Sequence, residues 1–286
     1  MKVLFCTDGS KISFNALSNL ANWASDIEVD VISVIDWGFL PDEVQVERKD
    51  FNSSCANVAD DILDYATDKL QKLGLTAGKM IKHCGSVVES ILEQTEIDDY
   101  DLVLLGSHGK KGIQKWLGSV SQEILNSSKN DIYISKEKND GKRVLFATDG
   151  SVHAFEVIKK SLSIYDFKEK EIFICTVCEE PDLLFLEGTL DTNWLLSIQK
   201  RQQDFAQQAL KEVQDLLVKN GLAISKSQIL IGNPTHEIIE YAKTSFVDLV
   251  LMGQREKSTM DKFLMGSICK RVLENIECDM FIIKNN

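Results

Sequence analysis

Two short polar sequences follow apolar runs in this chain and contain residue types that bind small anions. One is Thr7-Asp8-Gly9-Ser10, and the other extends from Gly106-Ser107 to Gly118-Ser119. Glycines after a strand let the backbone approach a ligand closely. A Gly-Ser pair that opens a helix offers free N–H groups, a hydroxyl and the positive end of the helix dipole. These residues indicate a phosphate site beside an aspartate able to bind a nucleoside. Turn glycines with a serine helix cap are the structural alternative.

Both sequences occur twice. Residues 2–10 return as residues 143–151, 141 positions later, and residues 102–107 return as residues 249–254. Self-similarity of this length is the mark of a duplicated domain. The chain is therefore predicted to be one domain written twice, and the two copies can be compared site by site.

The junction between the copies is predicted at residues 137–141, which are polar and contain a glycine. Domain boundaries usually fall in such linkers. We expect a first domain at residues 1–138 and a second at residues 139–286. Both are close to the usual size of a single domain.

Short apolar runs alternate with helical patterns in each copy. In the first copy, strands are predicted at 3–7, 29–35, 80–83, 102–105 and 132–134, and the last helix at 120–125. In the second, strands are predicted near 144, 172, 229, 249 and 280, with a long helix at 194–218. Continuous apolar runs are typical of buried parallel strands. The alternation predicts an α/β fold with five parallel strands per domain and right-handed crossovers.

Composition narrows the class of protein. The net charge of −12 argues against nucleic-acid binding, which needs a basic surface for phosphates. No apolar run approaches the roughly 20 residues of a membrane span, and the amino terminus shows no signal-peptide pattern. The seven cysteines are scattered and odd in number, as in reduced cytosolic proteins. We expect a cytoplasmic protein that binds neither nucleic acid nor membrane.

The Asp8-Gly-Ser sequence, together with Gly106-x-x-Gly109 and Gly118-Ser119, resembles the universal stress protein family. The resemblance covers nearly the whole chain as two tandem domains. It implies a Rossmann-like, five-stranded parallel sheet in each domain, with strand order 3-2-1-4-5 and helices on both faces. It also implies that edge strands pair such domains. We expect residues 132–134 and 280–283 to meet inside the chain, as an intramolecular pseudo-dimer. The sequence leaves a further homodimer through the helices undecided.

The resemblance also implies which residues bind a ligand. In the ATP-binding branch of the family, Gly-x2-Gly-x9-Gly-(Ser/Thr) holds the ribose and phosphates. The aspartate after the first strand and a backbone group at the end of the second serve the adenine. The implied nucleotide residues are Asp8, Val34, Gly106, Gly109, Gly118 and Ser119 in the first domain, and Asp149, Val177, Gly253, Gly266 and Ser267 in the second. ATP phosphates would bring Mg2+ with them.

Neither copy matches that motif in full. Only eight residues separate Gly109 from Gly118, and Glu256 stands where the second copy needs a glycine. A carboxylate there would repel a triphosphate, although the neighbouring Arg255 offsets its charge. We therefore expect the first site to be the better one. Lys110, Lys111 and Lys115 lie next to it and are able to meet phosphate oxygens, or to be solvated like most loop lysines.

The sequence shows no catalytic set. His108 follows the fourth strand without an identifiable partner, and the histidines and cysteines have no metal-ligand spacing. The predicted function is binding of an adenine nucleotide, ATP or AMP, by a stress-response regulator with at most slow ATP hydrolysis. The alternative is an adaptor of the same fold that binds no nucleotide and acts through protein partners.

Overall fold

The computed structural model describes residues 1–24, 26–36, 48–107, 117–137, 139–179, 192–254 and 266–284. The strands are β1 (Lys2–Cys6), β2 (Glu28–Ile35), β3 (Thr76–Cys84), β4 (Leu102–Gly106), β5 (Asp131–Ser135), β6 (Arg143–Ala147), β7 (Glu171–Cys178), β8 (Ile224–Ile231), β9 (Leu249–Gly253) and β10 (Asp279–Ile283). The helices are α1 (Lys11–Leu20), α2 (Arg48–Leu73), α3 (Val87–Ile97), α4 (Ser119–Ser127), α5 (Val152–Ile164), α6 (Thr192–Lys219), α7 (Pro234–Thr244) and α8 (Ser267–Asn275).

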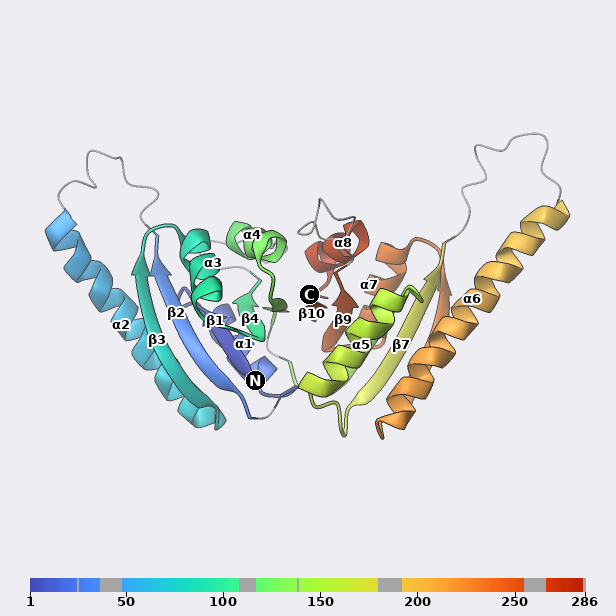
Figure 1. Cartoon of the computed structure of the whole chain (residues 1–286), viewed down its shortest axis with the longest axis horizontal. Helices are drawn as coiled ribbons and strands as arrows, with labels where there is room; N and C mark the ends of the chain where they lie inside the picture. The colour runs from blue at the N-terminus through green and yellow to red at the C-terminus, as the bar shows by residue number, and fades with distance from the viewer. Residues whose placement is uncertain are drawn as a thin grey trace.

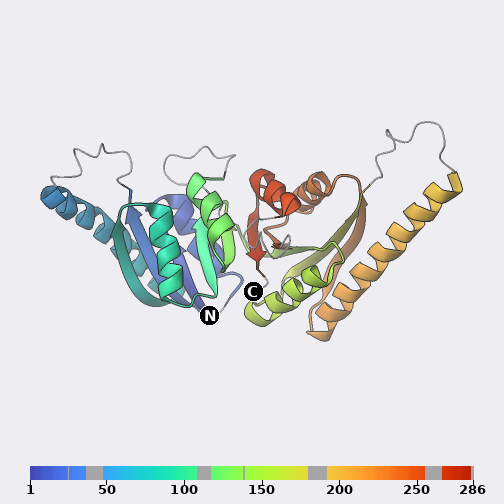
Figure 2. The same cartoon turned by 45° about the horizontal axis from the view of Figure 1, so that its top comes forward.

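The ten strands form one sheet in the order β3-β2-β1-β4-β5-β10-β9-β6-β7-β8. Each half of the chain, β1–β5 or β6–β10, therefore has the strand order 3-2-1-4-5 that the family resemblance implies. Neighbouring strands within each half are parallel, whereas β5 and β10 are antiparallel and place Met280 opposite Ile134. The two edge strands thus meet inside the chain, as expected. Figures 1 and 2 show the halves side by side, with α2 and α6 at the outer ends of the sheet.

Successive strand residues point to opposite faces, so each continuous apolar strand supplies two cores. Val3 and Phe5 of β1 face α1 and α2, while Leu4 faces α3 and α4; all three side chains are fully buried. In the second half, α5 and α6 cover the first face, and α7 and α8 cover the second. Each core contains residues from both halves, because the β5–β10 pair continues the sheet without exchanging its faces.

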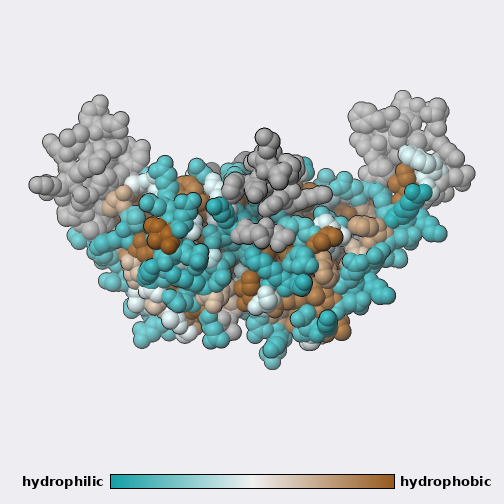
Figure 3. Space-filling view, in the orientation of Figure 1, coloured by the Kyte–Doolittle hydropathy of each residue, from teal (hydrophilic) through white to brown (hydrophobic). Residues whose placement is uncertain are grey.

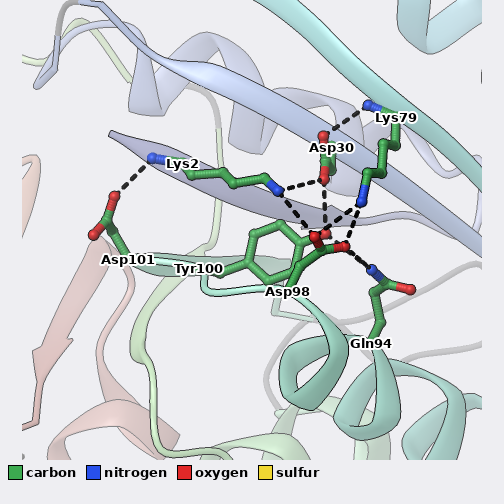
Figure 4. A network of polar contacts seen from close by, with 7 residues as sticks. All are labelled: Lys2, Asp30, Lys79, Gln94, Asp98, Tyr100 and Asp101. Carbon is green, nitrogen blue, oxygen red and sulfur yellow. Dashed lines mark hydrogen bonds and ion pairs between the residues drawn. The ribbon is translucent and has the colours of Figure 1, made fainter.

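A buried carboxylate lies near the amino ends of the first-half strands (Figure 4). Asp30 of β2 accepts hydrogen bonds from the Lys79 backbone amide at 2.7 Å and from the Tyr100 hydroxyl at 2.8 Å. The Lys2 ammonium lies 3.4 Å from it. Gly78 leaves room for this carboxylate, since a Cβ there would overlap it. The network therefore fixes β1, β2 and β3 to the segment that precedes β4.

The second half lacks this carboxylate. Phe173 pairs with Leu145 in the register where Asp30 pairs with Leu4. Its ring lies 6.4 Å from that of Tyr241 in an edge-on arrangement. The same position in the repeat is thus filled by an ion-pair network in one half and by aromatic packing in the other.

None of the helices that the structure describes is long and apolar enough to cross a membrane. The face shown in Figure 3 is largely hydrophilic, with small hydrophobic areas separated from one another.

Candidate functional site

The candidate residues of the first half lie at the carboxyl edge of its strands. β1 pairs with β2 on one side and with β4 on the other, so the strand order reverses at β1. Parallel α/β sheets bind ligands at such a point, beside the carboxyl ends of the strands. Asp8 follows β1, Gly106 ends β4, and the partly buried Val34 lies near the end of β2. The topology brings these three positions to one edge.

The turn after β1 holds an exposed carboxylate at that edge. Asp8 Oδ1 accepts the Ser10 amide at 3.0 Å, and Thr7 Oγ1 accepts the Gly9 amide at 3.0 Å. Gly9 has a φ of 76°, a left-handed conformation that glycine adopts without strain. Ser10 then caps α1 by accepting the Ser13 amide at 3.2 Å. The turn is therefore structural in its own right, and it fixes where the Asp8 carboxylate stands.

The first turn of α4 differs from most other helix starts. Gly118 is its N-cap, and no side chain among the described residues caps it; Ser119, the first helical residue, is exposed. By contrast, α1, α3, α5 and α7 each begin with a serine or asparagine whose side chain accepts a helix amide. The first N–H groups of a helix have no partner within it. At α4 no side chain among the described residues caps these N–H groups, so an anion can bind there.

This turn is also held close to β4. The Gly118 amide donates to the Ser107 carbonyl at 2.7 Å, and Ser121 Oγ donates to the Gly106 carbonyl at 2.9 Å. The strand β4 lies directly beside β1 in the sheet. The start of α4 is therefore tied to the strand that neighbours the Asp8 turn.

The glycines that end β4 and β9 have a packing role. A Cβ on Gly106 would lie 3.1 Å from the Ser13 Cα of α1. A Cβ on Gly253 would lie 3.0 Å from Val157 Cγ2 and 3.2 Å from His153 Nε2. Both glycines thus let a helix approach the end of a strand closely. That role accounts for them without a ligand.

The second half repeats the arrangement. Asp149 is exposed and accepts the Ser151 amide at 3.0 Å, and Val177 lies near the end of β7. Gly266 is the N-cap of α8 without a side-chain cap among the described residues, and Ser267 is exposed. Gly109, Lys110, Lys111, Lys115 and His108 lie outside the described residues, as do Arg255 and Glu256. The effects of the two departures from the nucleotide motif on ligand binding therefore remain sequence-based predictions.

Sequence reasoning did not single out two polar groups at the second site. His153 Nε2 and Gln254 Oε1 are buried, and neither atom has a hydrogen-bond partner among the residues that the structure describes. Position 153 corresponds to Ile12 of the first half, so comparing the two copies residue by residue would have shown the histidine. These groups make the second site chemically different from the first.

Among the described residues beside β1, the first site has neither a thiolate nor a metal cluster. Burial raises the pKa of the Cys6 thiol well above its ordinary value, so this cysteine at the end of β1 stays protonated at neutral pH. No group of three His, Cys, Asp or Glu side chains in the described part of the chain could hold a metal ion.

Comparison with known proteins agrees with this fold. The sequence model of the universal stress protein family matches residues 1–136 and again residues 141–284. The chain therefore belongs to the universal stress protein family, in its tandem two-domain form.

Individual relatives extend the same likeness. A universal stress protein of Methanocaldococcus jannaschii is 29% identical over 161 residues, which is 56% of this chain and 89% of the relative. A solved universal stress protein from Archaeoglobus fulgidus superimposes with a TM-score of 0.71 at 22% identity, over 100% of this chain and 98% of that one. A Pseudomonas aeruginosa structure gives a TM-score of 0.65 at 12% identity, over 99% and 92%. At these identities the two structures support the fold alone.

Proposed function

We propose that the chain binds an adenine nucleotide, ATP or AMP, at the carboxyl edge of its first half and acts as a stress-response regulator. The observation that carries the proposal is the start of α4. Its first turn has no described side-chain cap, and it is tied to the strand beside the exposed Asp8. Membership of the universal stress protein family supports the same assignment.

In this proposal the residues have separate roles. Asp8 and the backbone at Val34 meet the adenine end, and the phosphates lie over the first amides of α4, at Gly118 and Ser119. The helix dipole and the N–H groups favour the negative charge there. The described residues contain no group of three His, Cys, Asp or Glu side chains that would hold Mg2+ by itself. A magnesium ion would therefore be held by the phosphates.

The test places a carboxylate at the proposed phosphate position. Ser119→Glu puts a negative charge on the first residue of α4, where it favours the helix but repels phosphate. Ser267→Glu makes the same change at α8 and serves as the matched control. ATP at 100 times its dissociation constant should stabilise the wild type by about 2.7 kcal/mol. Thermal unfolding should show this shift in Ser267→Glu and not in Ser119→Glu.

Mass spectrometry of small molecules released from freshly purified protein gives the stoichiometry. About one adenine nucleotide per chain is expected if only the first site is competent. No released nucleotide, combined with no effect of ATP on the melting temperature, would contradict the proposal and favour the adaptor.

A further inference from the structure

Two buried lysines follow the strands that join the halves. Lys136 comes directly after β5 and Lys284 directly after β10, with exposures of 8% and 6%. The Lys136 amide donates to Asp279 Oδ1 at 2.7 Å, and the Lys284 amide donates to Asp131 Oδ1 at 2.9 Å. Each aspartate begins the opposite strand of the pair. The two lysines therefore occupy equivalent places across the β5–β10 pair.

Both lysine side chains reach a helix of the other half. Lys284 Nζ donates to the Leu125 carbonyl of α4 at 3.0 Å and to the carbonyl of Ser128, the C-cap of the same helix. Lys136 Nζ donates to the Leu273 carbonyl of α8 at 2.9 Å. The last turn of each of these helices is thus bound by a cation that the opposite half supplies.

Lys284 is itself held in place. Lys160 Nζ of α5 donates to the Lys284 carbonyl at 3.0 Å and to Asp131 Oδ1 at 2.8 Å. Burial lowers the pKa of Lys284 to about 8, and the Asp131 carboxylate opposes that fall. The ammonium form therefore prevails at neutral pH, and two carbonyls at the end of α4 meet a fixed positive charge.

The opposite end of α4 is the proposed phosphate site. The last carbonyls of a helix have no partner within it, and a cation there suits the helix dipole. The nine residues of α4 span about 13–14 Å at the usual rise of an α-helix. A helix this short moves as one body, so its last turn and its first turn are positioned together.

We propose that Lys284 is a positioning residue for the nucleotide site of the first half: the second half sets where the first amides of α4 stand. The inference rests on the proposed function for the identity of the ligand. It means that the first site is complete only when the second half is docked against it. Nucleotide affinity in one half is then coupled to the packing of the other.

The test compares three variants of the full chain by calorimetric titration with ATP. Lys284→Met removes the cation at the carboxyl end of α4, and Lys136→Met removes the equivalent cation at the carboxyl end of α8. Lys284→Arg keeps the charge and the hydrogen-bond donors. Lys284→Met should raise the dissociation constant for ATP about tenfold, which corresponds to about 1.4 kcal/mol, and Lys136→Met should change it by less than about twofold. Lys284→Arg should recover most of the affinity.

A spectroscopic readout separates positioning from a general loss of stability. The NMR amide signals of Ser119 and Val120 should shift in Lys284→Met without ATP and remain unchanged in Lys136→Met. If the methionine variant proves unfolded by circular dichroism, Lys284→Gln, which keeps a shorter donor, takes its place. Equal ATP affinity in the Lys284 and Lys136 variants would overturn the inference alone. Absence of ATP binding by the wild type would overturn the proposed function as well.

Discussion

At the scale of single residues, the buried Asp30 carboxylate makes the clearest prediction. Asp30→Ala leaves the Lys79 amide and the Tyr100 hydroxyl without this acceptor and removes one of the two carboxylates that the Lys2 ammonium contacts. Breaking a buried charge network from one side typically costs about 3 kcal/mol or more. Urea unfolding of the full chain should show a loss of that size.

Asp60→Ala is the control for this loss. Asp60 also pairs with a lysine, Lys82, at 2.8 Å, but both side chains are about half exposed. Exposed pairs contribute about 0–1 kcal/mol. Similar losses for the two variants would show that the Asp30 network contributes no more than a surface ion pair.

The candidate residues themselves were predictable to different degrees. Asp8 and Ser119 could be assigned to one edge from the sequence, because the carboxyl ends of parallel strands share an edge. The packing role of Gly106 could not, since it depends on the distance of α1 from β4. The contact of Lys284 with the other half could have been predicted from the sequence. Asp131 and Lys136 flank one buried strand just as Asp279 and Lys284 flank the other. A charge pair repeated around a buried strand predicts a contact across the repeat.

At the scale of elements, the continuous apolar runs located the strands well. The strand predicted at 102–105 is β4, Leu102–Gly106, and the helix predicted at 120–125 is α4, Ser119–Ser127. The exception is β3, predicted at 80–83 and observed over Thr76–Cys84. It is an edge strand with mostly exposed or partly exposed side chains, so its ends carry no apolar signal.

Helix caps give a prediction at this scale. Asn233 accepts the amides of both Thr235 and His236, at 3.1 and 3.2 Å, at the start of α7. Ser86 accepts one amide at 3.5 Å, at the start of α3. Replacing a cap by alanine typically costs about 1 kcal/mol. Asn233→Ala should therefore destabilise the chain by about 1 kcal/mol, and Ser86→Ala by less, as measured by thermal unfolding. The reverse order would show that tertiary packing, rather than the cap, fixes these helix starts.

At the scale of the whole molecule, one buried carboxylate links the halves. Asp279 begins β10 and is fully buried. It accepts hydrogen bonds from the Tyr133 hydroxyl, the Lys136 amide and the amide side chains of Asn19 and Asn139. Apart from Asp279 itself, every member of this set precedes β6 in the chain. The carboxylate therefore connects the second half to the first and to the segment between them.

The charge of Asp279 should make the stability of the molecule depend on pH. Burial raises its pKa to about 6 from an ordinary value of 3.8, and the four hydrogen bonds only partly oppose the rise. Between these two pKa values the folded state binds the proton and the unfolded state has lost it. The free energy of unfolding therefore falls as pH rises from about 4 to about 6. The change is about 3 kcal/mol and stops above pH 6.

Asp279→Asn isolates this effect, because it keeps the shape of the side chain without a titrating group. The difference in unfolding free energy, wild type minus variant, should fall between pH 4 and pH 6 and stay level from pH 6 to pH 8. Other carboxylates are present in both proteins and cancel in the difference. A difference that stays level from pH 4 to pH 6 would mean that the hydrogen bonds fully offset burial and that the halves are joined without a charge penalty.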